Sequence, residues 1–263
     1  MSHTDTRTGT LWWAEEGDPD RDALVLLHSL GTDSSMWAAQ LPVLRSRRRL
    51  ITIDLPGHGR SAAGAGPYRL EDLGGSVLAV ADRAGLDRFD VCGISLSGLI
   101  ALWLAIEAPD RVTSMVAANT AARIGTPEFW SERIRATRNR GMEGICDSVV
   151  PRFVTPEFAR HHPHHYRALE EAFVRIDPVG YVGCCAALRD GDVRDSVPTI
   201  TCPSLIIGGE EDVATPPQEG MWLHEHIPAS RIEIIAGASH LSNLDQPERF
   251  NQAVEDFLGL VAW

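Results

Sequence analysis

Three residues that lie far apart in the chain, Ser95, Asp212 and His240, have the side chains that acyl-transfer chemistry needs. A serine hydroxyl is a weak nucleophile, so it requires a general base, and the base requires a carboxylate that orients it. Each of the three follows a short apolar run of the kind that forms a buried strand. We therefore interpret Ser95 as a nucleophile, His240 as its base and Asp212 as the orienting acid.

The residues around Ser95 are typical of a sharp turn from a strand into a helix. Such a turn requires small residues two positions before and after the serine, because the strand and helix backbones approach closely there. Gly93 meets this requirement, whereas Ser97 stands where the motif has glycine, a departure that Gly98 eases. Ser97 is itself a poorer candidate nucleophile because Leu99 is too bulky to flank it. The alternative is an ordinary turn rich in glycine and serine.

The acid and the base each have an alternative explanation. Glu210 and Glu211 directly precede Asp212, which we prefer because a helix is expected to begin just after it. Asn119 follows an earlier strand and cannot supply a carboxylate. Taken singly, His240 is compatible with a structural loop histidine and Asp212 with a helix cap. The order serine, aspartate, histidine, with each residue at the end of a strand, favours a catalytic triad.

Acyl transfer also needs hydrogen-bond donors aimed at the oxyanion that develops on the carbonyl oxygen, and losing one costs about 3–4 kcal/mol. The residue after the nucleophile supplies one donor, the backbone N–H of Leu96. We assign the second to the N–H of Leu30, in the His-Ser-Leu-Gly loop at 28–31, where Gly31 lets the backbone turn inward. Ser29 in the same loop is a candidate substrate contact. A plain glycine turn is the alternative for this loop.

Apolar runs and helical patterns alternate through most of the chain, which predicts an α/β fold with a parallel sheet. Between residues 121 and 197 the strand signals disappear and helical patterns with many arginine, histidine and aromatic residues take over. We therefore expect a core of residues 1–120 and 198–263 with a helical cap of 121–197 inserted in it. The expected strands are 23–27, 50–53, 89–92, 112–118, 204–207 and 232–235, and the main expected helices are 70–84, 99–106, 127–139, 165–175, 217–226 and 247–258.

These motifs resemble those of the α/β-hydrolases over nearly the whole chain. Two further runs share the resemblance: Asp-Leu-Pro-Gly-His-Gly-Arg-Ser at 54–61 and Gly-Glu-Glu-Asp-Val-Ala-Thr-Pro at 209–216. Two cap segments, 124–130 and 180–190, resemble the 3-oxoadipate enol-lactonases of the β-ketoadipate pathway. The resemblance implies an α/β-hydrolase fold and a serine hydrolase without cofactor or metal. The expected reaction opens a small lactone that bears a carboxylate, 3-oxoadipate enol-lactone, to 3-oxoadipate.

A carboxylate-bearing substrate needs local positive charge, which arginine supplies through two parallel hydrogen bonds. Trp130 and Arg133 lie three residues apart on an expected helix and so share a face. We expect Trp130 to pack over the lactone ring and either Arg133 or Arg123 to bind the carboxylate. The alternative is a tryptophan in the core of the cap and a solvated arginine.

Other functions remain open at this stage. A hydrolase of other carboxylic esters or of carbon–carbon bonds would use the same triad, and a ligand-binding receptor could be built on the same scaffold. The proline in the histidine-rich stretch 161–165 breaks any helical spacing, so we expect a solvated turn there rather than a metal site.

The composition excludes several classes of partner. The chain has 263 residues with 36 acidic residues and 24 Lys+Arg, all of them arginine, so its net charge is −12. Such a charge repels nucleic acids and anionic membranes at a distance, and no apolar run approaches the roughly 20 residues that span a bilayer. Five cysteines without an export signal favour reduced thiols and a cytoplasmic location. The oligomeric state stays open.

Overall fold

A single eight-stranded sheet in the order β1-β2-β4-β3-β5-β6-β7-β8 forms the centre of the computed structural model, which describes residues 1–261. The last two residues of the expected core, 262 and 263, lie outside the described residues. β3 to β8 are parallel, and β2 joins β4 in antiparallel direction. The strands are β1 Ser2–Thr6, β2 Gly9–Glu16, β3 Ala23–Leu27, β4 Arg49–Ile53, β5 Phe89–Ile94, β6 Val112–Ala118, β7 Ser204–Gly209 and β8 Ser230–Ile235.

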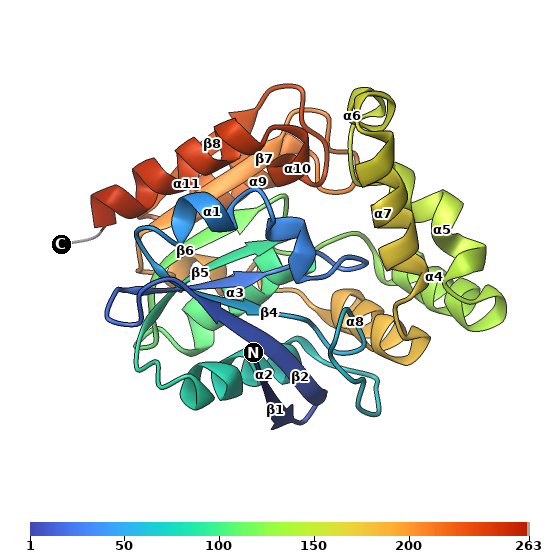
Figure 1. Cartoon of the computed structure of the whole chain (residues 1–263), viewed down its shortest axis with the longest axis horizontal. Coiled ribbons are helices and arrows are strands. Elements are labelled where there is room, and N and C mark those ends of the chain that lie inside the picture. The colour runs from blue at the N-terminus through green and yellow to red at the C-terminus, as the bar shows by residue number, and fades with distance from the viewer. Residues whose placement is uncertain (262–263) are drawn as a thin grey trace.

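Helices cover both faces of the sheet, which explains why its central strands are continuous apolar runs. Every residue of β3, β5 and β7 is buried, as expected for parallel strands covered on both sides. α2 (Leu70–Arg83) and α3 (Leu96–Glu107) lie on one side, and α1 (Leu41–Leu44) and α11 (Pro247–Val261) lie on the other (Figure 1). The carboxyl ends of the parallel strands consequently meet at one edge, where ligands bind in open α/β sheets.

A layer of helices is inserted between β6 and β7 and lies beside that edge, at the right of Figure 1. The predicted α/β fold with a helical insertion is thereby confirmed. Gly57 on the core touches Gly180 on the insertion, and a Cβ atom on Gly57 would lie 2.8 Å from the Gly180 Cα. The inserted helices are α4 Pro127–Arg140, α5 Glu143–Val149, η2 Val150–Arg152, α6 Pro156–His161, α7 Pro163–Val174 and α8 Pro178–Asp190.

The structure differs from the sequence-based expectation at the first strands of the sheet and at the start of the helix after Ser95. The hairpin of β1 and β2 was not predicted, and it extends the sheet beyond β4. The helix after Ser95 begins at Leu96 rather than at residue 99, so the N–H groups that follow the serine belong to its first turn. The remaining elements are η1 Ser34–Trp37, η3 Val197–Thr199, α9 Pro217–His226 and α10 Ser242–Asp245.

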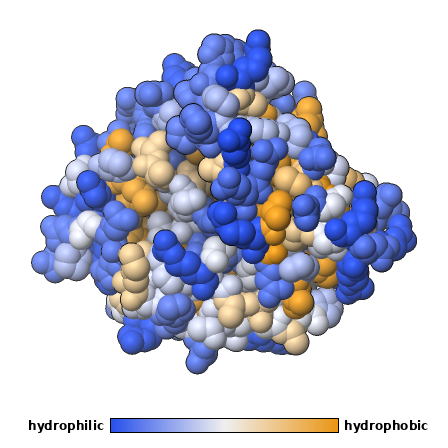
Figure 2. Space-filling model, turned by 45° about the vertical axis from the view of Figure 1, so that its right-hand side comes forward, coloured by the Kyte–Doolittle hydropathy of each residue, from blue (hydrophilic) through white to orange (hydrophobic). Residues whose placement is uncertain are grey.

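The surface on the cap side is mostly hydrophilic, and apolar side chains form small separate areas there (Figure 2). Among the described residues, no helix combines the length and the apolar character that crossing a bilayer requires.

Candidate active site

Ser95 occupies the sharp turn between β5 and α3, with φ 61° and ψ −120°. A positive φ is strained for a residue other than glycine and is found where the surrounding structure enforces it. A Cβ atom on Gly93 would overlap the Ser97 carbonyl oxygen, so glycine is required there for the turn to close. The Thr120 hydroxyl donates to the Ser95 carbonyl oxygen at 2.8 Å. The turn thus holds Ser95 in one conformation at the end of the central strand.

Asp212 and His240 meet at the ends of β7 and β8. The His240 Nδ1 lies 2.9 Å from the Asp212 Oδ2, so the Nε2 of the same ring is left to act on a neighbouring group. The Asp212 Oδ1 accepts the N–H groups of Ala214 and Thr215, at 2.8 and 3.0 Å. Glu211 and Glu210 are exposed, and the structure therefore brings Asp212, rather than its two neighbours, to His240.

The environment of Asp212 keeps its carboxyl group ionised. Burial opposes ionisation, but the charge of His240 and hydrogen bonds from His240, Thr215 and Asn119 outweigh it and lower the pKa of Asp212 to about 2. The Asn119 amide donates to the Asp212 Oδ2 and to the Ser239 carbonyl oxygen, both at 3.1 Å. Asn119, which has no carboxylate, thus binds both Asp212 and the loop that carries His240.

The loop of residues 28–31 places Leu30 in the wall of a cavity that Ser95 also lines, described below. In the part of the chain that the structure describes, neither the Leu30 N–H nor the Leu96 N–H donates to a protein acceptor. Buried N–H groups are rarely left unpaired. Two unpaired donors beside a candidate nucleophile fit an oxyanion site.

Two buried histidines, His28 and His58, hold the loop of residues 28–31 in place by accepting backbone hydrogen bonds. The N–H of Gly31 donates to the His58 Nε2 at 3.3 Å, and the N–H of Leu55 donates to the His28 Nε2 at 2.8 Å. Each ring nitrogen that accepts must be unprotonated, so both imidazoles are neutral. Burial is the main cause that lowers the pKa of both rings, and repulsion from His28, which would oppose a second proton beside it, contributes to lowering the pKa of His58 to about 3.

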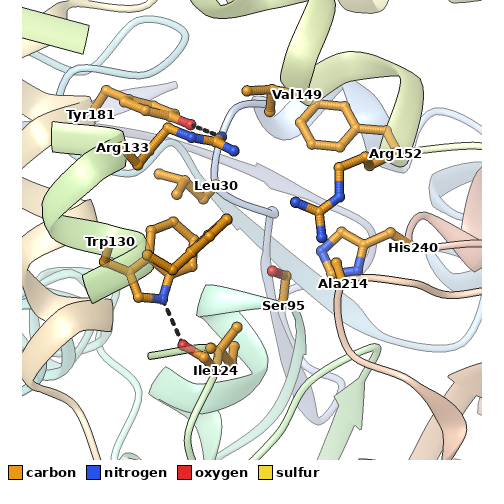
Figure 3. Close-up of a pocket in the computed structure, with 13 residues that line it drawn as sticks. Leu30, Ser95, Ile124, Trp130, Arg133, Val149, Arg152, Tyr181, Ala214 and His240 are labelled. Carbon is orange, nitrogen blue, oxygen red and sulfur yellow. Dashed lines mark hydrogen bonds between the residues drawn. The ribbon is translucent and has the colours of Figure 1, made fainter. Parts of the chain in front are cut away.

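A cavity of about 170 Å³ lies above Ser95 and His240, between the sheet edge and the cap (Figure 3). Trp130 forms one wall, and its indole N–H donates to the Ile124 carbonyl oxygen at 2.6 Å. Apolar cavities of comparable size hold a single small ring. The lining residues are Leu30, Ser95, Ile124, Gly125, Phe129, Trp130, Arg133, Val149, Arg152, Phe153, Tyr181, Ala214 and His240.

Two arginines of the cap, Arg133 and Arg152, point into this cavity from opposite sides (Figure 3). Arg133 donates to the Tyr181 hydroxyl at 3.2 Å, and the two guanidinium carbons lie 5.3 and 5.8 Å from the ring centre of Phe129. Among the described residues, neither guanidinium has a carboxylate within 4.0 Å. Both charges are therefore available to an anion in the cavity.

The structure does not bring every candidate to the cavity. Arg123 forms an ion pair with Asp192 at 3.3 Å and is not part of the cavity wall. Ser29 is buried, and its carbonyl oxygen accepts the Thr32 hydroxyl at 2.8 Å. Arg152 lines the cavity but was not predicted from the sequence, because it lies in η2 at the end of a short helical stretch with no clear periodicity.

Comparison with known proteins places the chain in a family. The family model described as alpha/beta hydrolase family matches residues 24–253. The chain belongs to the alpha/beta hydrolase family. This hydrolase is 39% identical to 3-oxoadipate enol-lactonase 2 of Acinetobacter baylyi over 92% of its own length and 91% of that protein. It is 35% identical to 3-oxoadipate enol-lactonase 1 of the same organism over 92% and 90% of the two chains.

A solved structure agrees with these relatives. The hydrolase superimposes on the enol-lactonase from Burkholderia xenovorans LB400 with a TM-score of 0.96 and 36% identity, over 98% of this chain and 100% of that one. Within the described residues of this hydrolase, no three His, Cys, Asp or Glu side chains are grouped so that they could hold a metal ion. The chemistry that its site offers is that of a serine, an imidazole, a carboxylate and two guanidinium groups.

Proposed function

We propose that this hydrolase opens a small lactone bearing a carboxylate, 3-oxoadipate enol-lactone, to 3-oxoadipate through an acyl-enzyme on Ser95. The observation that carries the proposal is the pair of guanidinium groups above Ser95 that have no carboxylate partner among the described residues, in a cavity of about 170 Å³. A neutral ester would leave these two half-buried charges without an opposite charge beside them, whereas a substrate carboxylate neutralises them. The relatedness to two enzymes named 3-oxoadipate enol-lactonases, and to a structure named an enol-lactonase, supports the same substrate.

The reaction begins when the Ser95 Oγ attacks the lactone carbonyl carbon and its proton passes to the His240 Nε2. Asp212 accepts the Nδ1–H of the same ring at 2.9 Å and stabilises the imidazolium that forms. The carbonyl oxygen becomes an oxyanion, which the N–H groups of Leu30 and Leu96 bind. The ring C–O bond then breaks, and His240 returns the proton to the leaving oxygen.

The leaving oxygen of a lactone stays attached to the acyl group, so the first half-reaction releases no product. Water then gives a proton to the His240 Nε2 and attacks the acyl carbon, and a second oxyanion forms at the same site. Its collapse breaks the bond to the Ser95 Oγ, which recovers the proton from His240. The product leaves as an open-chain acid in its enol form, which becomes 3-oxoadipate when the enol oxygen loses its proton and the neighbouring carbon of the double bond gains one.

The cap fixes the orientation of the substrate. Arg133 and Arg152 bind its carboxylate, and the indole of Trp130 packs over the ring. The hydrogen bond from Trp130 to Ile124 holds that wall rigid. Arg123, the other arginine considered for this role, is engaged by Asp192. Fixing both ends of a small substrate places its carbonyl carbon within reach of the serine, which lowers the entropic part of the barrier.

The experiment is turnover of 3-oxoadipate enol-lactone followed by product mass, in the parent protein and in Ser95→Ala. We expect rapid formation of 3-oxoadipate by the parent and loss of turnover in the variant, with the melting temperature of the variant close to that of the parent. A parent that hydrolyses p-nitrophenyl acetate but not the lactone would overturn the substrate and leave the serine hydrolase. A fully active Ser95→Ala would overturn the mechanism.

A further inference from the structure

Ser97 stands where the strand-to-helix motif has glycine, and the structure gives its hydroxyl a specific contact. Ser97 is completely buried, and its Oγ donates to the His28 carbonyl oxygen at 2.5 Å. The backbones of the strand and the helix approach closely in this turn, and Gly93 makes that possible because it has no side chain against the Ser97 backbone. The Ser97 side chain is directed to the neighbouring loop. The departure from the motif therefore adds a hydrogen bond that glycine cannot make.

This hydrogen bond joins the two segments that carry the candidate oxyanion donors. Ser97 lies one residue after Leu96 on α3, and His28 lies two residues before Leu30 in the loop after β3. Among the described residues, the Ser97 hydroxyl is the one donor to the His28 carbonyl oxygen. The loop makes other hydrogen bonds, among them those to the Ser29 carbonyl oxygen from Thr32, to His58 from Gly31 and to His28 from Leu55, and these run to groups outside α3.

We propose that Ser97 is a positioning residue that sets the separation of the Leu30 and Leu96 N–H groups. This inference rests on the serine-hydrolase part of the proposed function and not on the lactone. Both donors must lie about 2.7–3.1 Å from the place that the oxyanion will occupy. Without the hydroxyl, the buried His28 carbonyl oxygen loses its partner. The loop then shifts to satisfy it, and the donors no longer converge.

The experiment compares two variants of Ser97 with a matched control, Ser204→Ala. The two variants are Ser97→Gly, which restores the glycine of the motif, and Ser97→Ala. Ser204 is also completely buried and donates to a backbone carbonyl oxygen, that of Cys202 at 3.0 Å, but it lies at the opposite end of the sheet. The measurements are kcat and KM with p-nitrophenyl acetate and the rate at which an alkyl fluorophosphonate labels Ser95, read by intact mass. The melting temperature of each variant is measured in parallel.

We expect both Ser97 variants to lose about tenfold in kcat, part of the 10²–10³ that removal of a whole donor costs, with KM within twofold of the parent. Labelling of Ser95 slows by a similar factor, because the tetrahedral adduct places an oxygen between the same two donors. The pH at which kcat reaches half its maximum stays unchanged, since the base is intact. Ser204→Ala keeps both rates even where its melting temperature falls.

Three results would overturn the inference. The first is a Ser97→Gly or Ser97→Ala protein whose kcat stays within twofold of the parent. The second is an equal loss of rate in Ser204→Ala, because the loss would then reflect lower stability of the protein and not the position of Ser97. The third is a parent protein in which the fluorophosphonate does not label Ser95. Ser97→Ala differs from the parent by a single oxygen atom, so it decides the matter where Ser97→Gly does not fold. Failure of the lactone as a substrate leaves both readouts intact.

Discussion

The neutral state of His58 has a measurable consequence for the pH dependence of folding. Its folded pKa of about 3 lies below the ordinary value of 6.5, because burial, and to a lesser extent repulsion between His58 and His28 when both are protonated, disfavour the protonated ring. The unfolded chain therefore takes up a proton on His58 at a higher pH than the folded chain does. The stability that this group contributes is fully present above pH 6.5 and is lost as the pH falls toward 3.

The size of the effect follows from the two pKa values. A difference of one pKa unit corresponds to about 1.4 kcal/mol. Between pH 7 and pH 5 the unfolded imidazole becomes almost fully protonated and the folded one stays neutral, which lowers the free energy of unfolding by about 2 kcal/mol. The substitution His58→Gln keeps a side-chain acceptor for the Gly31 N–H and removes the titration.

The assay is urea unfolding of the parent and of His58→Gln at pH 8, 7, 6 and 5. Between pH 7 and pH 5 we expect the free energy of unfolding of the parent to fall by about 2 kcal/mol more than that of the variant. This expectation holds whatever the difference in unfolding free energy between the two proteins at pH 7. Between pH 8 and 7 the two proteins should change by the same amount, which serves as the internal control. Parallel curves from pH 7 to 5 would refute the reasoning, because they would mean that His58 titrates alike in the folded and unfolded chains.

Three further predictions concern activity. Arg133→Gln and Arg152→Gln should each lower kcat/KM for the charged lactone by about 10–100-fold, because each loses a hydrogen bond to a charged group. The same variants should change kcat/KM for the methyl ester of the lactone less than threefold, and Arg123→Gln should change neither value. Equal losses on both substrates in steady-state assays would contradict this. Asp212→Asn should lower kcat by about 10⁴-fold because the imidazole then holds the wrong tautomer, and a loss below tenfold would assign the acid elsewhere. Asp245→Asn should raise KM and lower kcat for both substrates alike. The Asp245 carboxylate connects the cap to the loop that carries His240, because it accepts the Thr155 N–H at 3.0 Å and the Ser239 N–H at 2.8 Å. A loss confined to the charged substrate would contradict that role.

The fold was predictable because its signals are local. Continuous apolar runs indicated β3, β5 and β7, since strands buried on both faces have no polar alternation. The turn at Ser95 was predictable for the same reason, because Gly93 and its neighbours act within a few residues. The order of Ser95, Asp212 and His240 added information that no single residue carried.

The parts of the site that sequence analysis missed depend on contacts between distant residues. Arg123 was a reasonable candidate until its partner Asp192, 69 residues away in sequence, was located. Arg152 carries no periodic signal, and only the packing of the cap brings it over Ser95. Ser97 looked like a tolerated departure from a motif, because its partner His28 is also 69 residues away.

The central claim is that Ser95 opens a carboxylate-bearing lactone through a covalent intermediate, and rapid-quench intact mass tests it most directly. Because the leaving oxygen of a lactone stays attached to the acyl group, the trapped protein should gain the full mass of 3-oxoadipate enol-lactone. The peptide that contains Ser95 should carry the whole increment, and Ser95→Ala should carry none. Rapid turnover by the parent with no increment at any quench time, together with full activity in Ser95→Ala, would contradict the claim.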